Sequence, residues 1–169
     1  MSLMSLLKRN RVDATLLINP IHFLSLGFGS GLSPYAPGTA GTLAAIPVFW
    51  LMASLSLELY LGIVVLLFIV GIYLCQQTTN KLGAHDHSAI VWDEVVGYLL
   101  TMIAVPFDWR WVIVGFFLFR LFDVWKPWPV RLLDRHVGGG LGIMLDDVGA
   151  AVYAALSLHA ILYIYEGML

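Results

Sequence analysis

The chain has 169 residues, of which 60% are hydrophobic and only 12% are charged, with a formal net charge of −2. Soluble globular domains contain about 45–50% apolar and about 25% charged residues, so this composition excludes an ordinary soluble domain and indicates a membrane protein. The length allows one compact bundle, and we expect a single helical domain over residues 1–169. The lone cysteine, Cys75, excludes an intrachain disulfide and a cysteine-rich zinc site.

The N-terminal part is expected to lie beside the bilayer rather than across it. Residues 1–19 form a polar segment without the cleavage pattern of a signal peptide. Residues 20–32 are apolar and glycine-rich but too short to span, which predicts an interfacial or re-entrant helix. A turn-rich loop over residues 33–42 follows.

The end of this loop, Pro-Gly-Thr-Ala-Gly-Thr at residues 37–42, precedes an apolar run. Small residues before a helix leave backbone N–H groups open to an anion, so substrate-binding candidates are Gly38, Thr39, Gly41 and Thr42. A plain turn with Thr42 as the N-cap of the helix fits the spacing equally well. The loop lacks the lysine of a P-loop, so nucleotide binding is not expected, and neither is a nucleic-acid partner.

Five apolar runs predict an all-α, polytopic membrane bundle: residues 42–57, 59–78, 89–107, 111–125 and 143–165. The first is short against the roughly 20 residues that a bilayer requires, so we expect four to five spanning helices. Eight of the nine lysines and arginines fall on the side of the N-terminus in this arrangement, and Arg110 is the exception. The bias toward positive residues inside places the N-terminus and the loops 79–89 and 125–143 in the cytoplasm.

Acidic residues gather at one depth of the predicted bundle. They come from three helices, and at about 1.5 Å rise per residue they lie about 5–9 Å below the cytoplasmic surface. Charged groups inside apolar helices are costly and commonly functional, and so many carboxylates would repel each other without a cation among them. Hard oxygen ligands suit Mg²⁺. The candidate metal ligands are Asp86, Asp93, Glu94, Asp123, Asp146 and Asp147.

Two alternatives stay open for these acids. They could be ordinary interfacial charges in salt bridges to Arg120, Lys126 and Arg131. Adjacent helical residues point about 100° apart, so only one of Asp93 and Glu94, and one of the pair at 146–147, is expected to face the ion squarely. Asp86 lies two helical turns before Asp93, where it is either a ligand or a helix cap.

The basic side of the predicted site comes from residues 120–126. Arg120 is able to bind a phosphate through two parallel hydrogen bonds, and Lys126 adds a point charge. Alternatively, Arg120 only neutralises Asp123, three residues away. The glycine run over residues 138–142 predicts either a flexible lid over the site or a linker.

Other functional classes of protein fit this sequence less well. No Gly-x-Ser-x-Gly elbow and no cysteine–histidine nucleophile pair is present, which disfavours serine-type hydrolysis. A small membrane cation carrier would spread its acids across the membrane depth, whereas these lie on one side. A lipid head-group transferase using the same metal would need a donor site for a nucleotide-linked substrate, and none is found.

The motifs together resemble the phosphatidylglycerophosphatase A family of bacterial membrane phosphatases. The matching segments are residues 27–32 (GFGSGL), 37–42 (PGTAGT), 90–97 (IVWDEVVG), 119–123 (FRLFD), 126–129 (KPWP) and 139–147 (GGLGIMLDD). The resemblance implies Mg²⁺-dependent removal of the terminal phosphate of phosphatidylglycerophosphate, giving phosphatidylglycerol, at the cytoplasmic side of the bacterial inner membrane.

The resemblance also implies roles for the charged residues. Mg²⁺ would be held by Asp93, Glu94, Asp123, Asp146 and Asp147, and phosphate charge would be neutralised by Arg120 and Lys126. Either water or an aspartate carboxylate would attack the phosphorus, and the oligomeric state is open.

Overall fold

The computed structural model describes residues 12–83, 87–130 and 137–168, and these residues form helices and connections without a strand. The expectation of an all-α fold is therefore confirmed for this part of the chain. In order, the elements are η1 (Ala14–Ile18), α2 (Pro20–Ser25), η2 (Gly27–Leu32), α3 (Pro37–Met52), α4 (Leu57–Leu82), α5 (Trp92–Thr101), α6 (Trp109–Trp125) and α8 (Gly139–Gly167). Residues 20–32 thus form two short helices.

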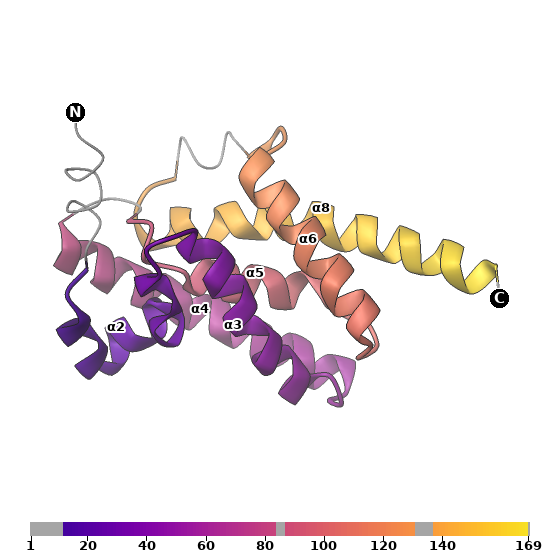
Figure 1. The fold of residues 1–169 in the computed structure, drawn as a ribbon, viewed down its shortest axis with the longest axis horizontal. Helices are drawn as coiled ribbons and strands as arrows, with labels where there is room; N and C mark the ends of the chain where they lie inside the picture. The colour runs from indigo at the N-terminus through magenta and orange to yellow at the C-terminus, as the bar shows by residue number, and fades with distance from the viewer. Residues whose placement is uncertain (1–11, 84–86, 131–136, 169) are drawn as a thin grey trace.

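The short helix α5 lies in the middle of the bundle and packs against α3, α4, α6 and α8 (Figure 1). Eight of its ten residues are buried. Gly97 permits a close approach of α6, because a Cβ at this position would lie 2.6 Å from the ring of Phe119. Other helices therefore surround α5 along its length.

The expectation that residues 89–107 span the bilayer is wrong in its extent. Ten helical residues rise about 15 Å, half of the hydrocarbon thickness. The helix ends at Thr101, Ala104 adopts a left-handed φ of 57°, and Pro106 cannot continue a helix. This apolar run therefore contains a buried helix of about half the length that a span needs, followed by the connection to α6.

Two helices are long and apolar enough to cross a membrane within the described residues: α4 with 26 residues and α8 with 29. The apolar helix α3 is shorter, with 16 residues. The structure therefore supports two candidate spans, and it does not reach the predicted four to five. Both long helices also pack against each other and against α5.

The helix α3 begins at Pro37, five residues before the predicted boundary. Proline suits the first turn of a helix, where its missing N–H is not needed. Thr42 lies inside the helix and its hydroxyl donates a hydrogen bond to the carbonyl of Gly38 at 3.0 Å. The interpretation of Thr42 as an N-cap is therefore wrong.

The helix α8 begins within the glycine run that was expected to be a lid or a linker. Gly138 is its N-cap and Gly139 its first residue. The N–H of Gly140 donates to Oε1 of Gln76 at 2.8 Å, and a Cβ at Gly140 would lie 2.7 Å from the backbone nitrogen of Gln76. These glycines let α8 start directly against α4, so residues 146–147 lie two turns into α8 rather than in its first turn.

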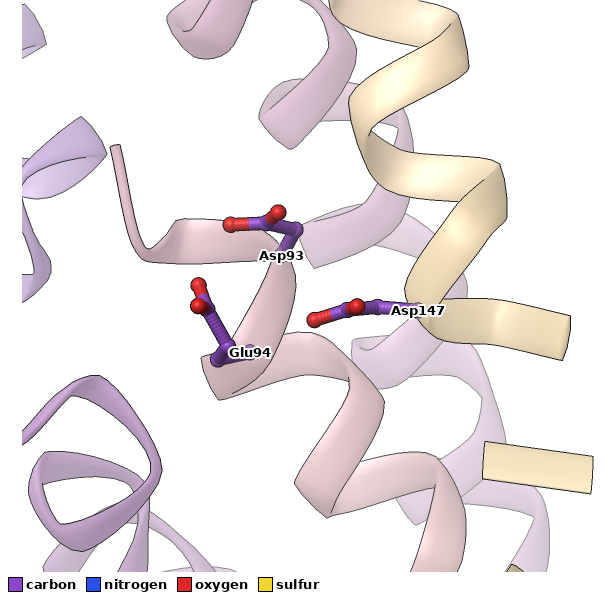
Figure 2. Close-up of side chains that lie close together, drawn as sticks. All are labelled: Asp93, Glu94 and Asp147. Carbon is purple, nitrogen blue, oxygen red and sulfur yellow. The ribbon is translucent and has the colours of Figure 1, made fainter. Parts of the chain in front are cut away.

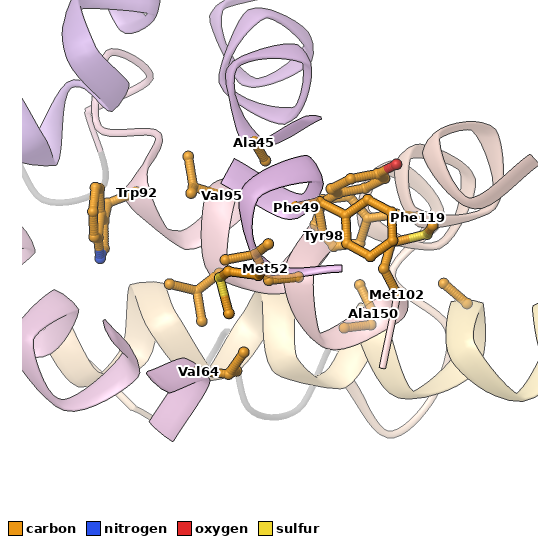
Figure 3. Close-up of a cluster of buried hydrophobic side chains, with 14 of the residues drawn as sticks. Ala45, Phe49, Met52, Val64, Trp92, Val95, Tyr98, Met102, Phe119 and Ala150 are labelled. Atoms are coloured by element: carbon orange, nitrogen blue, oxygen red, sulfur yellow. The ribbon is translucent and has the colours of Figure 1, made fainter. Parts of the chain in front are cut away.

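A continuous apolar core holds these helices together. Figure 3 shows Phe49 of α3, Tyr98 and Met102 near the end of α5, and Phe119 of α6 in this core. The rings of Phe49 and Tyr98 meet edge to face with centroids 6.3 Å apart. This part of the core fixes the C-terminal end of α5 against α3 and α6.

Candidate metal and phosphate site

Three carboxylates converge at the first turn of α5. Asp93 and Glu94 come from α5 and Asp147 comes from α8, and one oxygen of each lies within 4.8 Å of the others (Figure 2). Just before α5, Val91 is fully buried and its N–H donates to the carbonyl of Ser25 at 3.0 Å. This contact holds the start of α5 in place.

Adjacent residues share this cluster, contrary to the expectation from helical geometry. Both Asp93 and Glu94 contribute, because the longer glutamate side chain is able to bend back toward the aspartate (Figure 2). In α8 only Asp147 joins the cluster, and Asp146 forms an ion pair with Lys126 instead. The expectation that only one residue of each adjacent pair faces the ion therefore holds for Asp146 and Asp147 in α8, and it fails for Asp93 and Glu94 in α5.

The cluster fits a divalent cation by its unsatisfied oxygens. The buried atoms Asp93 Oδ1, Glu94 Oε2 and Asp147 Oδ2 have no hydrogen-bond partner among the described residues. Buried polar atoms without partners are rare, and each requires a physical reason. Carboxylate oxygens are the ligands that Mg²⁺ prefers, so these three residues could hold such an ion.

The C-terminal part of α6 supplies the positive charges. Nη1 of Arg120 lies 2.5 Å from Oδ2 of Asp123 and 3.8 Å from Oε1 of Glu94. Lys126 ends α6 in a left-handed conformation with φ of 47°, and its N–H donates to the carbonyl of Phe122 at 2.8 Å. Its ammonium group pairs with Asp146 of α8. Two ion pairs thus lie beside the carboxylate cluster.

All these charged groups line one cavity of about 400 Å³. The structure brings together seven of the charged residues predicted to form the site, namely Asp93, Glu94, Arg120, Asp123, Lys126, Asp146 and Asp147. Asp86 and Arg131 lie outside the described residues. The cavity is large enough for a phosphate ester, and it carries both anionic and cationic walls.

The predicted anion-binding loop, residues 37–42, contributes fewer side chains to the cavity than expected. Gly38 lines the cavity, and a Cβ there would overlap Oε1 of Glu94 and lie 3.1 Å from Nη1 of Arg120. Gly41 instead packs against Val91, with 2.7 Å from its built Cβ to that residue's Cβ, and Thr42 is fully buried. Thr39 is also not among the lining residues. Because α3 starts early, these side chains point along helical faces rather than around an open loop.

Sequence reasoning missed several residues of the lining. Ser88 and Ile90 come from the connection before α5, Ala36 and Pro37 precede Gly38, and Val124 follows Asp123. Proximity in sequence to predicted site residues was the available signal: Gly38 for Ala36 and Pro37, Asp93 for Ser88 and Ile90, and Asp123 for Val124.

Comparison with known proteins agrees with the chemistry of this cavity. The sequence profile described as phosphatidylglycerophosphatase A matches residues 23–162, which is most of the chain. The chain belongs to this family. The match includes every charged residue that the structure places in the cavity.

Individual members of the phosphatidylglycerophosphatase A family are close in sequence. The phosphatidylglycerophosphatase A of Escherichia coli K12 is 54% identical over 144 residues, covering 85% of this chain and 84% of the relative. That of Haemophilus influenzae is 46% identical over 158 residues, covering 92% and 97%. A Bacteroides thetaiotaomicron protein with a provisional name as a phosphatidylinositol-3-phosphatase is 42% identical over 139 residues, covering 78% and 86%. No solved structure matches the chain.

Proposed function

We propose that this protein hydrolyses the terminal phosphomonoester of phosphatidylglycerophosphate and yields phosphatidylglycerol and inorganic phosphate. Two relatives that cover most of the chain carry the name of this activity. The observation that carries the proposal is the single cavity in which Asp93, Glu94 and Asp147 face Arg120. A metal ion and positive side chains both offset the charge of a phosphoryl group during its transfer.

The three clustered carboxylates, Asp93, Glu94 and Asp147, would hold Mg²⁺. When bound, the ion would polarise the phosphoryl oxygens and offset their negative charge. The orphaned oxygens of these residues support this assignment. Asp123 and Asp146, predicted as further ligands, are instead assigned to holding the two cationic side chains in place.

Arg120 and Lys126 would bind the phosphate oxygens. A guanidinium group offers two parallel N–H donors to a phosphate, whereas an ammonium group acts as a point charge. The two groups reach the cavity from the end of α6, and Gly38 at the start of α3 lines the same cavity. Phosphate binding would shift them from their carboxylate partners toward the substrate, and Asp123 and Asp146 would keep them ordered before it arrives.

The site would lie at the cytoplasmic side of a multi-pass protein of the bacterial inner membrane. The predicted distribution of lysine and arginine along the sequence supports this orientation, since it assigns Arg110 alone of the nine basic residues to an outward-facing turn. At that end Arg110 donates side-chain hydrogen bonds to Asp108, which lowers the pKa of Asp108 to about 2. The two long apolar helices support association with the bilayer.

The test is phosphate release by purified protein from phosphatidylglycerophosphate in mixed micelles. We expect turnover with Mg²⁺ and loss of turnover in excess EDTA, restored by added Mg²⁺. Phosphatidylinositol 3-phosphate should be assayed in parallel, because the Bacteroides relative carries the name of that activity. Faster turnover of the inositol lipid would contradict the proposed substrate, and turnover in EDTA would contradict the metal.

A further inference from the structure

The exposed residues that line the cavity come from two kinds of segment, namely interhelical connections and a helix. Ala36 and Ser88 are exposed and belong to the connections that precede α3 and α5. Val124 is 75% exposed and belongs to the last turn of α6. One part of the rim is therefore made of loops, and the other part is an apolar helical residue.

Val124 continues an apolar face that runs along α6. Ile113, Phe117, Leu121 and Val124 follow at steps of four, four and three residues, and each is more than half exposed. Residues with this spacing lie on one side of a helix. If α6 lies within the bilayer, this face would contact acyl chains, and the rim at Val124 would border lipid directly.

Arg120 connects this face to the interior of the cavity. It lies one turn before Val124, and its side chain is only 18% exposed because it turns inward toward Asp123 and Glu94. On the neighbouring wall, a Cβ at Gly38 would lie 3.1 Å from Nη1 of Arg120, so α3 and α6 meet closely at that level. The lipid-side opening is therefore at the last turn of α6, beyond Arg120.

We propose that the lipid substrate reaches the cavity sideways across the last turn of α6, passing Val124. Its acyl chains lie along the face formed by Ile113, Phe117, Leu121 and Val124, and its phosphorylated head group turns inward to Arg120. The charge at this position suits the head group, because the guanidinium of Arg120 lines the cavity one turn from the apolar rim residue Val124. This proposal rests on the proposed function, since it requires a phosphorylated lipid as the substrate.

The substitution Val124→Trp tests this access path. A larger side chain at the rim should obstruct a lipid more than a small ester that enters from water. We compare phosphatidylglycerophosphate with its deacylated, water-soluble head group, glycerophosphoglycerophosphate. The ratio of the two kcat/KM values should fall about tenfold in this variant.

The matched control is Val152→Trp on α8. Val152 is also an exposed apolar residue, 53% exposed, but it does not line the cavity. The control should keep the parent ratio. An unchanged ratio in Val124→Trp, or an equal fall in both variants, would overturn the proposal.

A labelling experiment separates this proposal from the proposed activity. Phosphatidylglycerophosphate with a diazirine on one acyl chain is photolysed with the parent protein in EDTA, and the labelled peptides are mapped. We expect labelling of residues 113–124 that excess unlabelled phosphatidylglycerophosphate suppresses, and no such suppression on the exposed face of α4. Absence of suppressible labelling on α6 would reject the access path even if the protein hydrolyses the lipid. Suppressible labelling in EDTA, together with no hydrolysis of the same lipid in a parallel assay with Mg²⁺, would keep the path and reject the activity.

Discussion

Arg120 of α6 lies between two carboxylates, with Nη1 2.5 Å from Oδ2 of Asp123 on its own helix and 3.8 Å from Oε1 of Glu94 on α5. Asp123 is the tighter partner, whereas Glu94 also belongs to the carboxylate cluster. The guanidinium group thus joins the cationic wall to the candidate metal ligands. A phosphate bound to Arg120 would therefore lie next to the carboxylate cluster.

Replacement of Arg120 by lysine separates phosphate binding from simple charge pairing. A lysine keeps the positive charge but cannot offer two parallel donors. Losing one charge-assisted hydrogen bond that tightens in the transition state costs roughly 1.5–3 kcal/mol, or about 10- to 100-fold in rate. We expect Arg120→Lys to insert into the membrane normally and to lose turnover in this range, measured by phosphate release.

The control for this prediction removes both charges together, as Arg120→Leu with Asp123→Asn. If the arginine only neutralises Asp123, the double variant should be about as active as Arg120→Lys. If it binds phosphate, the double variant should be inactive. Substantial turnover in the double variant would show that neither side chain contacts the substrate.

Removal of a cluster carboxylate should weaken metal binding as well as turnover. Asp93→Asn and Asp147→Asn each replace a charged ligand by a neutral group of similar shape. An ion that binds only the folded protein raises its melting temperature, so Mg²⁺ should stabilise the parent and stabilise these variants much less. Turnover should fall by about two or more orders of magnitude.

The matched control is Asp108→Asn, which alters an acidic residue at the opposite end of α6. It should keep both the Mg²⁺-dependent stabilisation and the turnover of the parent. Equal stabilisation of all variants by Mg²⁺ would show that the cluster does not hold the ion.

A methyl group at Gly38 should damage the site without unfolding the bundle. The built Cβ overlaps Oε1 of Glu94 and approaches Nη1 of Arg120 to 3.1 Å. We expect Gly38→Ala to displace these side chains and to lower kcat by about tenfold or more, since small misplacements of positioned groups are costly.

Gly62→Ala on α4 provides the comparison, because nothing lies within 4 Å of its built Cβ. In a helix interior alanine is more favourable than glycine by about 1 kcal/mol. This variant should be fully active and no less stable than the parent. Parent-like turnover in Gly38→Ala would show that the approach of α3 to Glu94 is not part of the site.

The proposed orientation can be tested with single cysteines in intact cells. Tyr35→Cys replaces a side chain that is 79% exposed in the connection before α3, and Gly167→Cys lies at the exposed end of α8. Native Cys75 is buried and should remain silent. A membrane-impermeant maleimide should label Gly167→Cys from outside and Tyr35→Cys only after permeabilisation. The reverse pattern would place the cavity on the outer side.

Composition and motifs were enough to predict a helical chain of this family and most of the charged residues that line its cavity. An apolar excess with few charges indicates helices in a membrane. Charged residues inside such helices are costly and commonly functional. That reasoning selected Asp93, Glu94, Arg120, Asp123 and Lys126, and all of them line the cavity together with residues 146–147. The same motifs carried the family resemblance that the profile match confirms.

Packing in three dimensions sets how far each helix extends and where its side chains point, and this could not be predicted from the sequence. Hydropathy measures how strongly a segment avoids water, and it cannot distinguish burial against other helices from exposure to lipid. The hydropathy of the apolar run around α5 therefore predicts a full span, although the helix is short and enclosed. Side-chain direction depends on where a helix starts and on what packs beside it. For this reason Glu94 joins Asp93, Asp146 turns to Lys126, and Thr42 lies in the core.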